Sequence, residues 1–419
     1  MFLEKETFTG KKNKIIVGYD LGDLWSQISV CRLDDKEPET LSVVAGEQQY
    51  NFPTALCRRT ETNQWVYGKE AVKLAAQGRG PSVDRLLTLA REGAEVEAGE
   101  EKLDPVALLA LFMKRSLSLL GLTALPQQIE MVMITVDELD RRTAEVLTQA
   151  ASLMELQAQQ VYFQSYAESF YHYMLHQPRE LWMGQSLICD YEGDRLKTYR
   201  LDWNKRTTPV VAFVEDQEYC PMQPEDEALL KIAEENCGDR TISSVYLLGR
   251  EFEGDWYQES LRYLCRGRRV FRGDNLYSKG ACYGARGRVM PDETEKQFVF
   301  LGKDKLQANV GMEALRGGQD SYYALLDAGV NWFEAEKRCE FYLENGNSFS
   351  IRVISLTGKE NKEIEIILND LPVRQERATR IRMLISMESG EEVSVTLEDM
   401  GFGEIYPATH KIWQEKFTI

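Results

Sequence analysis

The segment IIVGYDLGDLWSQISV, residues 15–30, decides the fold of this chain. Its apolar first half indicates a buried strand that ends at Asp20, and Gly22 allows a tight turn. Residues 26–30 then indicate a second strand that returns at once beside the first. A strand, a glycine turn and a returning strand together form the outline of a phosphate-binding hairpin. The start of the chain therefore predicts a loop of the kind that holds phosphates.

Length and composition are those of an ordinary globular protein. The chain has 419 residues, enough for two or three domains, and is 43% hydrophobic and 28% charged. No run of eighteen apolar residues occurs, so we expect no membrane span. Residues 1–14 are charged and contain no apolar core, which argues against a secretory signal. These features predict a cytoplasmic protein.

Cysteine usage and charge restrict the compartment and the partners. None of the eight cysteines forms a CxxC pair, which predicts buried thiols in a reducing cytosol. The formal net charge of −17 disfavours nucleic acid as a partner. The basic run at residues 262–269 is a local exception. It can contact an acidic partner, or it can be a solvated helix end and turn.

Strands and helices alternate in the N-terminal part of the chain. Hydrophobic periodicity predicts strands at residues 14–20, 26–33, 129–136 and 156–163, and helices at residues 69–76, 141–154 and 167–175. A further helix is predicted to begin at Asp104-Pro105, an N-cap followed by proline, and to stop near Gly121. Alternating strands and helices predict an α/β sheet with crossover connections.

The pattern changes near residue 297. Short strand-like runs separated by turn-rich pieces follow, at residues 298–301, 322–326, 338–343, 348–356, 363–368, 380–387 and 392–397. Short, evenly spaced strands with few helices are typical of a β-sandwich. We therefore predict a domain boundary within residues 287–297.

Several segments, in their order along the chain, resemble those of the Hsp70 chaperones within the actin, hexokinase and Hsp70 superfamily. Residues 20–22 resemble the first phosphate loop, "DLGTT", and residues 187–194 fall on the second, "DLGGGT". Residues 245–250 resemble the adenosine motif "VLVGG", and residues 274–285 resemble the "NPDEAVAYGAA" that follows it. The further matches are at residues 52–54, 67–71, 133–136, 156–158, 164–169 and 310–318.

The resemblance implies a two-part architecture. Residues 1–290 are expected to form an α/β actin-like ATPase fold with ribonuclease H-like lobes, lobe I over about 1–180 and a truncated lobe II over about 181–290. Residues 297–419 are expected to form a β-sandwich that resembles the Hsp70 substrate-binding domain. Only 55 positions (245 − 190) separate Asp190 from Val245. The subdomain that closes over the adenine in the family is therefore predicted to be missing.

The resemblance also implies a remnant nucleotide site. Asp20 matches the aspartate that orients magnesium-bound water, although it can equally be a residue that caps the end of a strand. The complete predicted set is Asp20, Gly22, Asp190, Gly193, Gly249 and Gly284. No catalytic residue and no metal ligand is assigned, and ATP with magnesium is expected to bind weakly if at all.

The sequence departs from the family at the positions that do the chemistry. In the first loop Asp23 and Leu24 replace two threonines, and in the second loop Glu192 and Asp194 replace glycines. Arg195 stands where the family has threonine, and either binds a phosphate or neutralises the two carboxylates beside it. Two further changes fall on the catalytic lysine, here Asp84, and on the acidic residue of "EPTAAA", here Gln164. Carboxylates in place of phosphate contacts repel phosphate.

Other chemistry has little support in the sequence. There is no GxxxxGK[ST] loop and no recognisable nucleophile motif. His172 and His176 are four residues apart and can share a metal face on a helix, but a third ligand is not evident. Phe402, between two glycines, is either an exposed anchor for a partner or the buried residue of a tight turn.

Taken together, the residues predict a bacterial, cytoplasmic, non-catalytic Hsp70-like protein that binds another protein or a peptide as adaptor or scaffold. The alternative is a slow ATP-binding, chaperone-like ATPase or nucleotide sensor. A third reading is an actin-like filament former, which a terminal β-sandwich would hinder. Gln319 and Asp320 replace apolar residues of the family's peptide-binding loop, here residues 314–321, so any groove is expected to be polar.

Overall fold

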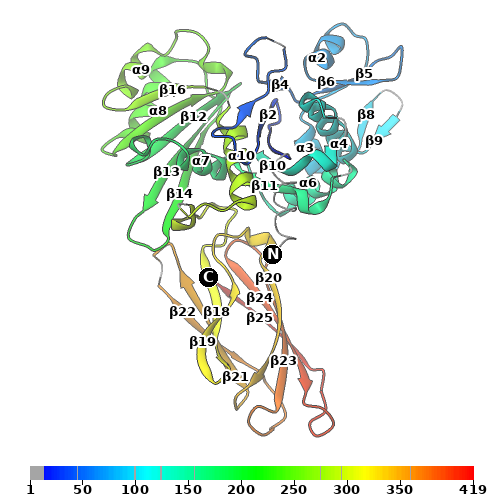
Figure 1. Cartoon of the computed structure of the whole chain (residues 1–419), viewed down its shortest axis with the longest axis vertical. Coiled ribbons are helices and arrows are strands. Elements are labelled where there is room, and N and C mark those ends of the chain that lie inside the picture. The colour runs from blue at the N-terminus through cyan, green and yellow to red at the C-terminus, as the bar shows by residue number, and fades with distance from the viewer. Residues whose placement is uncertain are drawn as a thin grey trace. The chain divides into compact units, whose positions relative to one another are not determined.

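A computed structural model describes residues 14–44, 46–98, 101–122, 125–154, 156–273, 275–293, 295–358 and 360–419. The N-terminal charged segment, apart from Lys14, and Asp274 of the "NPDEAVAYGAA" match lie outside the described residues. The chain divides into two compact units (Figure 1). The first contains the described residues through Trp203 together with Val214–Gln297, and the second contains Asn204–Phe213 and Phe298–Ile419.

The first unit begins with a sheet built on the predicted hairpin. Strand β1 (Ile15–Leu21) pairs antiparallel with β2 (Trp25–Cys31) and parallel with β10 (Ile129–Val136), and β10 pairs parallel with β11 (Val161–Ser165). The order is β11-β10-β1-β2-β3, with β3 at Glu39–Thr40, and β4 (Phe52–Pro53) also pairs with β2. Because β1 and β10 are buried on both faces, they are almost continuously apolar.

A second sheet repeats this arrangement. Strand β12 (Gln185–Glu192) pairs antiparallel with β13 (Arg195–Asn204) and parallel with β15 (Ile242–Leu248), which pairs parallel with β16 (Arg269–Arg272). Its order is β16-β15-β12-β13-β14-β17, and the first five strands match the order of the first sheet; β14 spans Val210–Tyr219 and β17 spans Phe298–Phe300. We call the regions around the two sheets the first and second lobes. Between Asp190 and Val245 the chain forms only β13, β14 and helix α8 (Asp226–Cys237), so no separate subdomain lies there.

Helices cover the sheets, and their starts follow local capping rules. The Asp104 side chain accepts a hydrogen bond from the Val106 N–H at the start of α4, and Asp140 does the same for Thr143 at the start of α6. The helices are α2 (Gly68–Ala76), α3 (Leu86–Glu92), α4 (Pro105–Ser116), α5 (Leu125–Gln128), α6 (Arg141–Leu153), α7 (Tyr166–Leu175), α8, α9 (Gln258–Leu264) and α10 (Leu276–Val289). No helix in the described part is both long and apolar enough to span a bilayer.

Helices α7 and α10 pack against each other, and α10 lies between the two sheets of this unit (Figure 1). Glycines make this close approach possible. A Cβ at Gly18 of β1 would lie 2.1 Å from the Ser278 carbonyl oxygen of α10, and a Cβ at Gly280 would lie 2.0 Å from the Ser169 carbonyl oxygen of α7. The chain returns through α10, more than 250 residues after β1, to complete the core of the first lobe.

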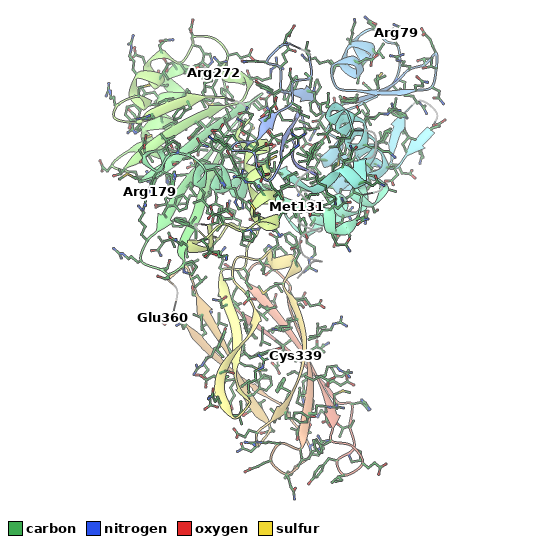
Figure 2. All side chains as sticks on the ribbon, viewed as in Figure 1. Arg79, Met131, Arg179, Arg272, Cys339 and Glu360 are labelled. Atoms are coloured by element: carbon green, nitrogen blue, oxygen red, sulfur yellow. The ribbon has the colours of Figure 1, made fainter. Side chains whose placement is uncertain are left out.

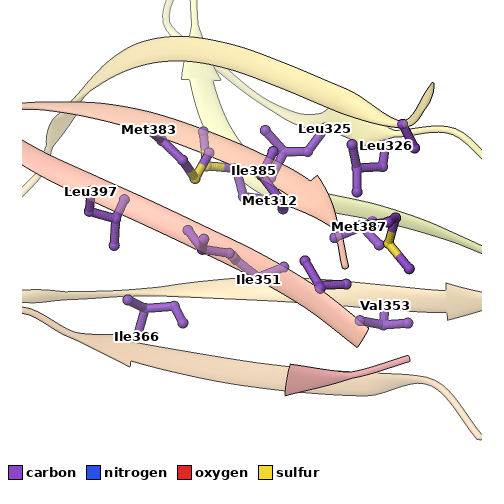
Figure 3. Packing of buried hydrophobic residues seen from close by; sticks show 14 of the residues in the cluster. Met312, Leu325, Leu326, Ile351, Val353, Ile366, Met383, Ile385, Met387 and Leu397 are labelled. Atoms are coloured by element: carbon purple, nitrogen blue, oxygen red, sulfur yellow. The ribbon is translucent and has the colours of Figure 1, made fainter. Parts of the chain in front are cut away.

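The second unit holds two four-stranded antiparallel sheets around one hydrophobic core. Figure 3 shows Ile385 of one sheet beside Met312 of the other. One sheet has the order β19-β18-β21-β22 and the other β20-β23-β24-β25. The strands are β18 (Ala308–Arg316), β19 (Gln319–Leu326), β20 (Glu336–Leu343), β21 (Ser348–Ser355), β22 (Lys362–Ile367), β23 (Thr379–Met387), β24 (Glu392–Gly401) and β25 (Ile412–Thr418). Strand β17 (Phe298–Phe300) pairs with the first residues of β14, within this unit.

Every strand-like run predicted after residue 297 is confirmed as a strand. Three other expectations were wrong or incomplete, two in this unit and one in the first. Strands β18 and β25 were not predicted. Residues 314–321, expected to form a loop, are the two ends of the β18–β19 hairpin, because Gly317 and Gly318 both take the positive φ that a two-residue turn needs. Strand β11 begins at Val161, since Ala158–Gln160 forms a short 3-10 turn where a strand was expected.

A buried ion pair anchors two loops of the second unit. The Arg374 guanidinium donates two hydrogen bonds to the Asp399 carboxylate, at 2.6 and 2.7 Å, and Asp399 is 0% exposed. The Thr409 and Gly401 N–H groups also donate to this carboxylate. Burial alone would raise the pKa of Asp399, but these donors outweigh it and hold the pKa below its usual range.

We expect Arg374→Ala to lower the free energy of unfolding by about 3–5 kcal/mol, because it leaves a buried carboxylate without its cation. Chemical denaturation measures this. The matched control is Arg377→Ala, which removes the exposed pair with Glu344 and should cost less than about 1 kcal/mol. Equal losses in the two variants would contradict the structural role of Arg374.

Candidate functional site

The two hairpins face each other across a cleft of about 470 Å³ between the lobes of the first unit. Its walls include Asp20 and Trp25 of the first hairpin and Asp190 and Glu192 of the second. This volume lies within the range of small-molecule sites. The ionisable side chains of the lining are Arg85, Arg91, Arg195, Lys197, Asp20, Asp23, Asp137, Glu138, Asp190, Glu192 and Asp194, in which carboxylates outnumber cations.

Two stacked tyrosines join the two hairpin aspartates. The Tyr166 hydroxyl, at the start of α7, donates to Asp20 Oδ1 at 2.7 Å. The Tyr277 hydroxyl of α10 donates to Asp190 Oδ2 at 2.9 Å. The two rings lie parallel, with centroids 3.9 Å apart and an interplanar angle of 8°. A continuous path of contacts therefore links the two hairpins through the aromatic pair, which we call the tyrosine bridge.

Burial shifts the titration of both aspartates toward neutral pH. Burial raises the pKa of Asp20 to about 7; the hydrogen bond from Tyr166 lowers it, and the nearby Asp190 charge raises it further. Burial likewise raises the pKa of Asp190 to about 7, against the hydrogen bond from Tyr277. Each aspartate has one tyrosine donor and no cation among its described hydrogen-bond and ion-pair partners. The protonated carboxyl is therefore favoured to unusually high pH.

A second charged group, which sequence reasoning missed, lies beside the bridge. Asp137, at the end of β10, accepts from Lys197 Nζ at 2.7 Å and from Arg195 at 2.8 Å, and it is also bonded to the Tyr199 hydroxyl. Burial would raise the pKa of Asp137, but the Lys197 and Arg195 cations and these hydrogen bonds together lower it. The cluster joins the end of β10 to the returning strand of the second hairpin. An acidic residue directly after a buried strand was the only signal for it.

Trp25, which lines the cleft, makes a cation–aromatic contact. The Arg250 guanidinium lies over the Trp25 ring, 4.5 Å from its centroid, and the Arg250 N–H donates to Glu192. The Gly193 N–H, expected to face phosphate, donates to Glu251 at 3.1 Å. Glu192 and Gly193 of the second hairpin thus bind the segment after β15.

The structure brings Asp20, Gly22, Asp190 and Gly249 together in the lining, whereas Gly193 and Gly284 are outside it. Two of these glycines have packing roles. A Cβ at Gly249, where φ is +92°, would lie 2.1 Å from the Tyr191 carbonyl oxygen, and a Cβ at Gly284 would lie 2.5 Å from Gln164 Oε1. Gly22 closes the first hairpin through its N–H bond to the Trp25 carbonyl.

Asp23 and Asp84, two residues that depart from the Hsp70 pattern, have surroundings that differ from those expected. Asp23 binds the start of α3, because its carboxylate accepts from the Thr88 N–H and hydroxyl, at 3.1 and 2.5 Å. Asp84 is exposed and outside the lining, while the next residue, Arg85, lines the cleft with a left-handed backbone (φ 49°). A cation on this side of the cleft is therefore supplied by Arg85.

Three other residues singled out in the sequence, Arg195, Gln164 and His176, contact groups within the chain. Arg195 pairs with Asp137 and Glu218, not with the adjacent carboxylates that were expected to neutralise it. Gln164 is buried and donates to the Ser169 hydroxyl at 2.6 Å. His176 stacks on Tyr283 and lies 3.3 Å from Glu295. In the described ranges, no three His, Cys, Asp or Glu side chains group so as to hold a metal ion.

The two raised pKa values predict a specific pH dependence. A carboxyl whose pKa rises from 3.8 in the unfolded chain to about 7 in the folded one stabilises the fold at low pH, and this contribution is lost as pH rises through 7. Asp20→Asn/Asp190→Asn should therefore lose less unfolding free energy than wild type between pH 5 and pH 8, by on the order of 2 kcal/mol per carboxyl.

Chemical denaturation at the two pH values checks this prediction. Asp255→Asn, at an exposed position, is the matched control and should follow the wild-type pH profile. If the double variant also parallels wild type, the two aspartates do not titrate as the cleft geometry implies.

Comparison with known families and proteins places the chain as follows. Residues 37–303 match the C-terminal part of a family of unknown function (DUF5716), and residues 305–419 match a domain of unknown function (DUF8552). Comparison with curated proteins finds no relative. The first match includes β10, which pairs with the first hairpin, and β15, which pairs with the second. It also includes both residues of the tyrosine bridge and α10. Because it covers more than half of the sequence, the chain belongs to the DUF5716 family.

Proposed function

We propose that this protein is a non-catalytic adaptor or scaffold with a degenerate nucleotide cleft. In this proposal the first unit has an actin-like ATPase fold with two ribonuclease H-like lobes. The second unit is a β-sandwich that resembles the Hsp70 substrate-binding domain and binds another protein. The matching strand orders of the two lobes, and the packing of α7 and α10 beside them, support the proposed fold.

The tyrosine bridge is the observation that carries the non-catalytic part. A metal-bound triphosphate needs the aspartates of both hairpins ionised and turned toward the ion. Here Asp20 and Asp190 accept hydrogen bonds from Tyr166 and Tyr277, whose rings stack in the space between them. A metal-bound nucleotide would have to compete with both hydroxyl donors for these carboxyls, whose protonated form is favoured by burial. Strong binding of ATP is therefore not expected.

Nearby cations support a second candidate, a weak nucleotide sensor. Arg85 and Lys197 line the cleft, and Arg85 takes a left-handed backbone conformation that non-glycine residues rarely adopt. Lys197, however, already pairs with Asp137 at 2.7 Å. A phosphate would have to compete with this buried carboxylate, which favours the adaptor over the sensor.

A groove in the second unit supports the protein-binding part. It measures about 930 Å³ and is lined by β18, β20, β21 and Phe402. Tyr342 and Phe402 are 51% and 46% exposed, and their rings meet edge to face at 5.9 Å. Exposed aromatic side chains beside a hollow are typical anchors for a partner. We infer that the groove takes an extended segment with apolar side chains, with Phe402 as an exposed anchor.

The proposal places the protein in the bacterial cytoplasm. All eight cysteines are free, and Cys31, Cys57, Cys189, Cys237 and Cys282 are buried. Free thiols are typical of a reducing compartment. The net charge of −17 supports a protein partner in preference to nucleic acid.

Titration calorimetry with ATP and magnesium tests the cleft. We expect wild type to bind with a dissociation constant weaker than about 100 μM, because burial and the tyrosine donors oppose the binding of a metal ion at the two carboxyls. Tyr166→Ser/Tyr277→Ser removes both rings and should bind more tightly, provided that thermal melting shows it folded. A wild-type constant below about 10 μM, or hydrolysis above the buffer rate, would overturn the non-catalytic reading.

Selection of displayed twelve-residue peptides on the folded chain tests the groove. We expect enriched peptides to bind at least tenfold more weakly to Tyr342→Ala/Phe402→Ala, because the variant loses both exposed rings. Val373→Ala, at a fully exposed position outside the groove, is the control and should bind as wild type. No enrichment, or equal binding to the double variant, counts against a peptide site here.

A further inference from the structure

A strongly basic segment lies in the second lobe of this acidic chain. From Arg262 to Arg272 the sequence reads RYLCRGRRVFR, with five arginines and no carboxylate, in a protein of net charge −17. The segment comprises the end of α9, a turn at Gly267 and strand β16 (Figure 1; Arg272 is labelled in Figure 2). Its charge is opposite to that of the chain as a whole. A local excess of this kind calls for a physical explanation.

Most of these arginines are not neutralised by neighbouring carboxylates. Arg262 pairs with Glu259, and Arg269 lies 3.8 Å from Glu180 in an exposed contact. The other three have no carboxylate partner within the described part of the chain. Arg266 and Arg268 lie over the Tyr263 ring, and Arg272 is exposed. The segment therefore presents uncompensated positive charge to solvent.

Strand β16 also forms the edge of its sheet. It pairs in parallel with β15 on one side, and on its other side no strand pairs with it among the described residues. The Gly273 N–H donates to the Leu247 carbonyl. The backbone N–H and C=O groups of Phe271 and Arg269, two and four residues earlier, therefore also face β15. The N–H and C=O groups of Val270 and Arg272 consequently face away from the sheet. They can pair with another strand.

The side chains along this edge combine charge with an apolar surface. Phe271 is 37% exposed, and its ring stacks on that of Tyr246 at 5.1 Å. Because neighbours on a strand point to opposite faces, Arg269 and Phe271 share one face and Arg272 lies on the other. An added strand would place its own side chains alternately on the same two faces. A strand that alternates acidic and apolar residues could then set its acidic side chains toward Arg272 and cover Phe271 with its apolar ones.

We propose that the edge of β16 is a docking site for an extended acidic segment of a partner protein, which pairs with β16 as an additional strand. Backbone hydrogen bonds give such complexes affinity, and side-chain charge selects the partner. A long nucleic acid fits less well, because its charge is repelled by the rest of the chain and it cannot pair with a strand edge. Arginines that only protect the edge from aggregation are the competing explanation. This surface is separate from the groove of the second unit.

Fluorescence anisotropy with a labelled VEVEVEVE peptide tests the proposal on the full chain. We expect binding in the micromolar range at 50 mM NaCl that weakens at least tenfold at 500 mM, because charge pairs are screened. Arg269→Glu/Arg272→Glu should bind at least tenfold more weakly than wild type. The matched control, Arg79→Glu/Arg338→Glu, makes the same charge change at exposed positions elsewhere and should bind within twofold of wild type.

A second peptide separates strand pairing from charge alone. The same sequence with an N-methyl group on every peptide nitrogen keeps its charge but has no backbone donor on either edge, and it should bind at least tenfold more weakly. The proposal is overturned if the peptide does not bind, if the N-methylated peptide binds equally well, or if the edge variant binds like its control. It is also overturned if a twelve-residue oligothymidine binds more tightly than the acidic peptide. Thermal melting of both variants shows whether they are folded.

Discussion

The contact on which the cleft depends is the parallel stack of Tyr166 and Tyr277. Each ring carries its hydroxyl to a buried carboxyl, and the rings meet at 3.9 Å between the two hairpins. A buried carboxyl without a donor is costly, and a buried hydroxyl without an acceptor is costly too. The stack satisfies all four groups at once.

Other charged side chains in and beside the cleft are likewise paired within the chain. Asp137 and Lys197 neutralise each other, Asp23 binds the start of α3, and Arg250 covers Trp25. Each of these charged groups already has a partner within the chain. Any ligand must therefore exchange existing contacts for new ones, which reduces the net affinity.

Close packing of α10 holds the tyrosine bridge in place. Gly18 and Gly280 let backbone approach backbone where any side chain would collide, so α10 cannot shift without disturbing β1 or α7. Tyr277 lies one turn from Gly280 on this helix. The position of its ring is thus determined by the packing of the first lobe, although its hydroxyl serves an aspartate of the second.

The sequence by itself determined the local elements. The apolar hairpin around Gly22, the strand at residues 129–136 and the helix starts at Asp104 and Asp140 were predicted because turns, caps and periodicity act over a few residues. The resemblance to the two Hsp70 phosphate loops assigned Asp20 and Asp190 to one site, and both line the same cleft. The strands of the second unit were predicted for the same reason. The exceptions are β18, where Gly311 interrupts the pattern, and β25.

Only the tertiary structure decided what the cleft contains. Tyr166 and Tyr277 are 111 positions apart (277 − 166), and Asp137 and Lys197 are 60 apart. Such pairs have no spacing rule, because their contact depends on how helices and sheets pack. Likewise, only the structure shows that Arg85, with its left-handed backbone, lines the cleft and that Asp84 does not. Local forces shape the elements, but the partners of a buried charge are chosen by packing, which one-dimensional patterns do not record.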